Sequence, residues 1–176
     1  MKNYFYLHFF RLNLHKNLRT QIQLIDLAQE KLSAAQNLLN GEFYTDAYYI
    51  GGYSLELYLK ASICKTLKID DLFDFEKVNV RKLPLSDGSR RFSMDNLYKP
   101  FKVHDYCQLF ILSGLYHEFE SKINSDGEFN LSWMVVCSWN EELRYSTERK
   151  NKIDVETFLD SLNTIISWLQ PYLSSI

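Results

Sequence analysis

The 176-residue sequence has few glycines and prolines, few cysteines and no long hydrophobic run. Six glycines and three prolines are too few for a disordered, collagen-like or low-complexity chain. No stretch approaches the roughly 18 consecutive apolar residues of a membrane-spanning helix, so we expect one globular domain with no membrane association. Neither sign of charge dominates, because 20 basic residues stand against 22 acidic ones. The net charge of −2 argues against a wholly basic nucleic-acid binder.

Cysteine and histidine are also scarce. Cys64, Cys107 and Cys137 are widely spaced in apolar stretches, which is typical of reduced, buried thiols and predicts a cytoplasmic protein. His104 and Cys107 lie three residues apart on a predicted helix, but His117 is too far along that helix to share one ion with them. We therefore expect no metal site and no cofactor.

Aromatic residues are abundant instead. The 12 Tyr, 12 Phe and 3 Trp residues make up 15% of the chain, which is typical of a packed core or of a partner interface. Apolar residues recur every three or four positions over 18–39 and 45–66, which predicts two amphipathic helices. The short link between these segments makes them antiparallel neighbours, and Gly41 is expected to end the first in a left-handed conformation.

Gly51 and Gly52 lie inside the second predicted helix. Each glycine costs about 1 kcal/mol of helix propensity, a cost usually tolerated where another helix must approach closely. Three more helices are predicted in the second half: one that is capped by Asp105 and ends before 125–127, a short buried helix over 131–144, and a last helix from an N-cap at Asp154 to about Pro171. We therefore predict a mainly α fold, an up-and-down bundle of about five helices in a single domain spanning 1–176.

Two regions fall outside the helical pattern. Residues 1–17 are predicted to form an aromatic N-terminal arm that packs on the body or on a second subunit. Residues 68–103 are predicted to form an inserted β-hairpin or loop, because apolar and polar residues alternate on both sides of a Ser-Asp-Gly-Ser turn. Seven basic residues and two acidic ones lie within 77–104, which is compatible with nucleic-acid binding or with a solvated edge hairpin protected by its charges. The candidate nucleic-acid contacts there are Arg81, Lys82, Arg90 and Arg91.

Glu56 and Lys60 form the most informative charged pair. They lie four residues apart with the glutamate first, the favourable order for an ion pair within a helix. An ordinary surface pair is one interpretation. The other is a pair kept at a buried face for a function, because leucines occupy positions 55, 57 and 59 around it. No phosphate-binding glycine loop and no glycine-flanked nucleophile is present.

The segment from Tyr49 to Ala61 resembles the second helix of the HEPN family (higher eukaryote and prokaryote nucleotide-binding domains), which carries a similar small-residue, Glu-x-x-Leu-Lys-Ala pattern. His104-Asp105-Tyr106 is similar to the opening of that family's third helix. The resemblance covers about 20–66 and 104–170. It implies a small helical bundle, a homodimer, nucleotide or RNA binding, and a place in a toxin–antitoxin or defence system.

Many members of that family are metal-independent ribonucleases that use an arginine, a following polar residue and a histidine about one helical turn later. In this chain Arg144 is followed by Tyr145, and no histidine occurs after His117. The resemblance therefore implies binding without ribonuclease activity, and no catalytic residue is assigned.

Our first hypothesis is that a nucleotide or RNA binds to a site formed by Glu56, Lys60, His104, Asp105, Arg144 and Tyr145. Arg144 would hold phosphate in a forked geometry and Tyr145 would stack. The second hypothesis is a non-enzymatic interaction module that binds a cognate partner protein through the aromatic arm and a bundle face. The third is a divergent metal-independent ribonuclease that uses His104 with Arg144.

Overall fold

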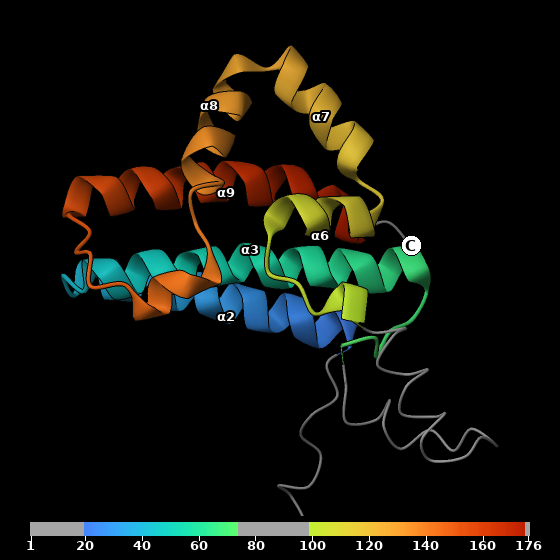
Figure 1. Ribbon diagram of the computed structural model, residues 1–176, viewed down its shortest axis with the longest axis horizontal. Coiled ribbons are helices and arrows are strands. Elements are labelled where there is room, and N and C mark those ends of the chain that lie inside the picture. Colours follow the sequence, from blue (N-terminus) through green and yellow to red (C-terminus); the bar gives the residue numbers. More distant parts are fainter. Residues whose placement is uncertain (1–19, 74–98, 175–176) are drawn as a thin grey trace, which may run out of the picture.

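The computed structural model describes residues 20–73 and 99–174, and most of these residues are helical (Figure 1). They contain no strand, which confirms the mainly α prediction. The predicted arm over 1–17 lies outside the described residues, and so does most of the predicted insertion over 68–103, including Arg81, Lys82, Arg90 and Arg91. The described ends of that insertion, 68–73 and 99–103, contain turns and a short 3₁₀ helix but no strand. Among the helices described, none is long and apolar enough to cross a membrane. The elements are α2 (Gln21–Asn40), α3 (Tyr44–Leu67), η2 (Lys99–Phe101), α6 (Tyr106–Ser113), α7 (Tyr116–Ser125), α8 (Gly127–Val136), η3 (Glu141–Tyr145) and α9 (Lys152–Ser174).

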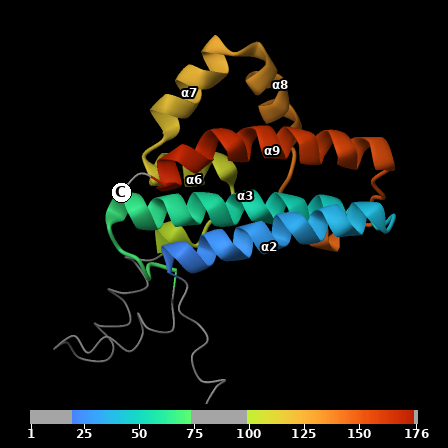
Figure 2. The same ribbon diagram turned by 180° about the vertical axis from the view of Figure 1, so that it is seen from behind.

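Helices α2 and α3 form the predicted antiparallel hairpin, and α9 runs alongside them (Figure 2). Thr20 starts α2 with a capping box, because its side chain accepts from the Gln23 amide while the Gln23 side chain accepts from the Thr20 amide. The prediction that Gly41 ends α2 in a left-handed conformation is wrong. Gly41 has φ −85°, and Glu42 takes the positive φ of 65°.

Helix α3 is the central helix, in contact with α2, α6, α9 and η3. Its two glycines allow close approach, as predicted. A Cβ on Gly51 would lie 2.6 Å from the Leu159 side chain of α9, and a Cβ on Gly52 would lie 2.3 Å from the Trp139 ring. The group against Gly52 is therefore a single indole from the segment after α8, rather than a helix.

The helices of the second half differ from the prediction in their boundaries. The single helix expected from Asp105 to the 125–127 turn is two helices, α6 and α7, because Gly114 takes a left-handed φ of 75° and ends α6. The helix expected over 131–144 begins earlier, where Asp126 caps α8, and it ends at Val136. Leu131 and Met134 are 65% and 63% exposed, so α8 is only half-buried.

Helix α9 also starts before its predicted cap. The Asn151 side chain accepts from the Asp154 amide, so Asn151 caps the helix and Asp154 lies in the first turn. Pro171 does not end α9, which continues to Ser174. These differences raise the number of described α-helices from the expected five or so to six.

Many of the aromatic residues pack in the hydrophobic core. Helices α7 and α8 form an inverted V over α9 (Figure 1), and rings from α6, α7, α8 and α9 pack against one another. The closest pair has ring centroids 4.0 Å apart. The rings are Phe110, Phe119, Phe129, Trp133 and Trp168.

The predicted burial of all three cysteines is wrong, because only Cys64 is buried, whereas Cys107 and Cys137 are exposed at the ends of α6 and α8.

Candidate functional site

A buried carboxylate lies at the centre of the candidate site. The Glu56 side chain is fully buried on α3, and its Oε1 lies 2.6 Å from Lys60 Nζ and 2.9 Å from His104 Nδ1. Its second oxygen, Oε2, has no hydrogen-bond partner among the described residues. Lys60 is 14% exposed and its ammonium lies 5.5 Å from the ring centroid of Phe73. The structure therefore brings together three of the residues that the sequence singled out.

The start of α6 holds His104 in this position. Asp105 caps α6 by accepting from the Gln108 amide at 2.8 Å, and Tyr106 donates its hydroxyl to the Gly52 carbonyl of α3 at 2.7 Å. Burial, together with the nearby negative charge of Glu56, raises the pKa of Tyr106 well above its usual value. Tyr106 therefore stays a neutral donor and ties the two helices together.

Glu56 orients the His104 ring. An imidazole that donates from Nδ1 to a carboxylate keeps Nε2 for another partner. The His104 side chain is 41% exposed and lines a pocket of about 310 Å³. Nε2 is therefore the ring atom available to a ligand: it accepts a proton when the ring is neutral and donates one when the ring is charged.

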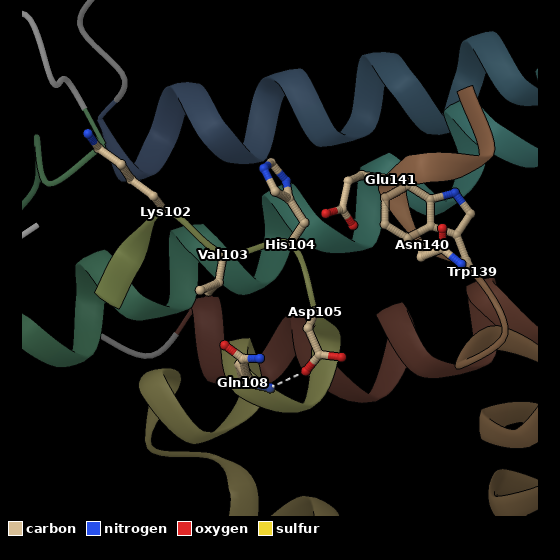
Figure 3. A pocket seen from close by; sticks show the side chains of 8 residues that line it. All are labelled: Lys102, Val103, His104, Asp105, Gln108, Trp139, Asn140 and Glu141. Atoms are coloured by element: carbon tan, nitrogen blue, oxygen red, sulfur yellow. Dashed lines mark hydrogen bonds between the residues drawn. The ribbon is translucent and has the colours of Figure 1, made fainter. Parts of the chain in front are cut away.

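Three segments line this pocket: the stretch before α6, the first turn of α6, and the residues that lead into η3. Figure 3 shows Lys102 at one end, Asn140 and Trp139 at the other, and between them His104 with the Glu141 carboxylate turned toward it. The indole of Trp139 is buried against α3, where it donates to the Tyr49 carbonyl and stacks on Tyr106. The lining residues are Lys102, Val103, His104, Asp105, Gln108, Trp139, Asn140 and Glu141.

Arg144 and Tyr145 do not line the pocket, but they lie close to it along the chain. Both are exposed on η3, and the Arg144 guanidinium lies 4.8 Å from the ring centroid of Tyr145. Side chains three residues apart eclipse one another in a 3₁₀ helix, so Arg144 shares a face with Glu141. The pair therefore extends from the Glu141 end of the pocket. Lys60 does not line the pocket, although its ammonium contacts Glu56.

Sequence reasoning missed several residues of the pocket as candidate ligand contacts, namely Gln108, Trp139, Asn140 and Glu141. An asparagine two residues before Glu142, followed by two acids, is a helix-start signal that would have marked the turn at η3.

A second, smaller pocket of about 180 Å³ lies at the start of α3, beside Arg149 and Lys150. No group of three or more His, Cys, Asp or Glu side chains is placed to hold a metal ion within 20–73 and 99–174.

Comparisons with known proteins give no match to this chain, whether the comparison is with protein families, with curated proteins or with solved structures.

Proposed function

We propose that this protein is a HEPN-like domain that binds a nucleotide or RNA at the pocket beside Glu56. The contact that carries the proposal is the 2.9 Å interaction between Glu56 Oε1 and His104 Nδ1, which leaves Nε2 of the imidazole for a ligand. A buried carboxylate that holds a half-exposed imidazole is a costly arrangement. Buried charged groups with a specific partner beside a cleft are often found at functional sites.

The cations around the pocket favour a phosphate group. Lys102 and His104 lie on one segment, and Arg144 lies one turn beyond Glu141 with its guanidinium against an exposed ring. Arginine and lysine supply most phosphate contacts in nucleic-acid complexes, and an exposed aromatic ring can stack on a base. The pocket has a volume in the usual range for small-molecule sites.

Titration of short single-stranded RNA and of nucleoside monophosphates at low salt tests the proposal. His104→Ala is expected to weaken binding by about tenfold or more, because hydrogen bonds to charged groups contribute about 1.5–3 kcal/mol. Arg144→Ala is expected to weaken RNA binding and to flatten its dependence on salt.

Matched controls separate a site from a general charge effect. His117 is an exposed histidine on α7, and Arg149 is an exposed arginine that lines the smaller pocket. His117→Ala and Arg149→Ala should leave affinity close to that of the wild type. Equal losses in Arg144→Ala and Arg149→Ala would contradict a specific role for Arg144, and unchanged affinity in His104→Ala would refute the proposal.

The Glu56–His104 pair also favours a second candidate, a metal-independent ribonuclease. His104 Nε2 would take the proton of the 2′-hydroxyl as its oxygen attacks phosphorus, and Glu56 would stabilise the resulting imidazolium. The 5′-oxygen would leave as the P–O bond breaks and take a proton from water. Incubation with RNA in the presence of a chelator is the test. Any cleavage should vanish in His104→Ala and persist in His117→Ala, and cleavage that survives in His104→Ala excludes this role.

The homodimer, the cognate partner protein and the toxin–antitoxin or defence setting stay predictions from the family resemblance. Nucleic-acid binding by Arg81, Lys82, Arg90 and Arg91 stays a prediction from the local excess of basic residues.

A further inference from the structure

A carboxylate with no partner among the described residues lies beside the imidazole in the pocket. Glu141 is half-buried and lines the pocket, and Figure 3 shows its carboxylate turned toward the His104 ring. Asp105, the other carboxylate in the lining, is engaged in capping α6. Because no ion pair joins Glu141 to His104 or to another described residue, its oxygens are available to a ligand that lies next to the ring.

The His104 ring contributes one further polar atom to the pocket. Its Nδ1 lies 2.9 Å from Glu56 Oε1, so Nε2 is the atom that remains for a ligand. Nε2 accepts a hydrogen bond when the ring is neutral and donates one when the ring is charged. An ionised Glu141 only accepts. The two side chains therefore fit a ligand that presents a donor to Glu141 and, next to it, a group that can either donate or accept.

Hydroxyl groups have this property. A hydroxyl carries one hydrogen and two lone pairs, so it can donate to a carboxylate and can either donate to an imidazole or accept from it. A ligand edge with N–H donors alone would oppose the N–H of a charged imidazole. A phosphate oxygen would be repelled by the Glu141 carboxylate. Two adjacent hydroxyls therefore match Glu141 and His104 in both protonation states of the ring.

A ribonucleotide carries two adjacent hydroxyls, on C2′ and C3′ of its sugar, and a carboxylate binds the ribose hydroxyl in dinucleotide-binding sites. We propose that Glu141 and His104 hold the 2′,3′-diol of a ribonucleotide, with Glu141 accepting from one hydroxyl and His104 Nε2 bonding the other. The diol belongs either to a free nucleotide or to the 3′ end of an RNA, because the 3′-oxygen of an internal residue is part of a phosphodiester. This inference rests on the proposed function and adds the part of the ligand that is recognised.

Binding of AMP, 2′-deoxy-AMP and 3′-deoxy-AMP, measured by calorimetry at low salt, tests this assignment. AMP should bind the wild type about tenfold or more tightly than either deoxy form, because each deoxy form leaves one polar group of the site without its hydrogen bond. Glu141→Ala should weaken AMP binding and remove the preference for one of the two hydroxyls. His104→Ala should remove the preference for the other.

Glu142→Ala is the matched control, since Glu142 is exposed next to Glu141 but does not line the pocket. It should bind AMP as the wild type does, and circular dichroism should show all three variants folded. Two short RNAs, one with a free 3′-terminal diol and one with a 3′-deoxy terminal residue, distinguish the sources of the diol. A tighter complex with the first identifies an RNA end, whereas equal binding of both RNAs together with the preference for AMP identifies a free nucleotide.

Equal affinity for AMP and its two deoxy forms would overturn the diol assignment, and so would equal AMP affinities of Glu141→Ala and Glu142→Ala. If His104→Ala still weakened AMP binding in either case, nucleotide binding at the pocket would stand and only the recognition of the diol would fail. Absence of binding to every nucleotide and RNA would refute the proposed function and the diol assignment together.

Discussion

Replacing Glu56 with alanine should lower the free energy of unfolding by about 3–5 kcal/mol, the loss that follows when one member of a buried ion pair is removed. The Glu56 carboxylate is fully buried, and one of its oxygens contacts both Lys60 and His104. Without it, the ammonium of Lys60, which is 14% exposed, keeps little access to water. Urea denaturation of wild type and variant measures the loss.

Glu30 provides the matched control, because it is an exposed glutamate inside α2. Glu30→Ala should change stability by no more than about 0.5 kcal/mol. A double-mutant cycle with Glu56→Met and Lys60→Met tests the pair itself. The double variant should lose less than the sum of the two single losses, because removing both charges leaves no unpaired buried ion. Strict additivity would show that the two groups do not interact.

Gly52→Ala should also destabilise the protein, although alanine is the better helix former. The new Cβ would lie 2.3 Å from the Trp139 ring, which is held by its hydrogen bond to Tyr49 and by its stacking on Tyr106. Overpacking of this kind costs about 1–3 kcal/mol, against a gain of about 1 kcal/mol in helix propensity. We expect a net loss of up to about 2 kcal/mol in chemical denaturation.

The other glycines provide a graded comparison. In Gly51→Ala the closest atom is the end of the flexible Leu159 side chain, so the loss should be smaller. Gly127 at the start of α8 has no atom within 4 Å of its added Cβ, and Gly127→Ala should be neutral or stabilising by up to about 1 kcal/mol. A stability for Gly52→Ala equal to that of Gly127→Ala would mean that Trp139 does not pack against α3.

The predicted helix boundaries were correct where one local signal marks them and wrong where several signals compete. The spacing of apolar residues located α2, α3 and α9, and the N-cap of α6 was correctly assigned to Asp105. Gly114 followed apolar residues at helical spacing, which hid the break between α6 and α7. The apolar run that begins at Leu131 looked buried on all sides, yet Leu131 and Met134 face outward on α8.

The sequence by itself determined a helical bundle, the antiparallel α2–α3 hairpin and the ion pair of Glu56 with Lys60, because each depends on residues close together in the chain. Only the tertiary structure decided that His104 contacts Glu56 across 48 residues, and that Trp139 fills the space left by Gly52. It also decided that Asn140 and Glu141 share a pocket with Lys102. Contacts between distant segments depend on how the helices pack. The spacing of apolar residues along one helix does not specify which side chain of another segment will contact that helix.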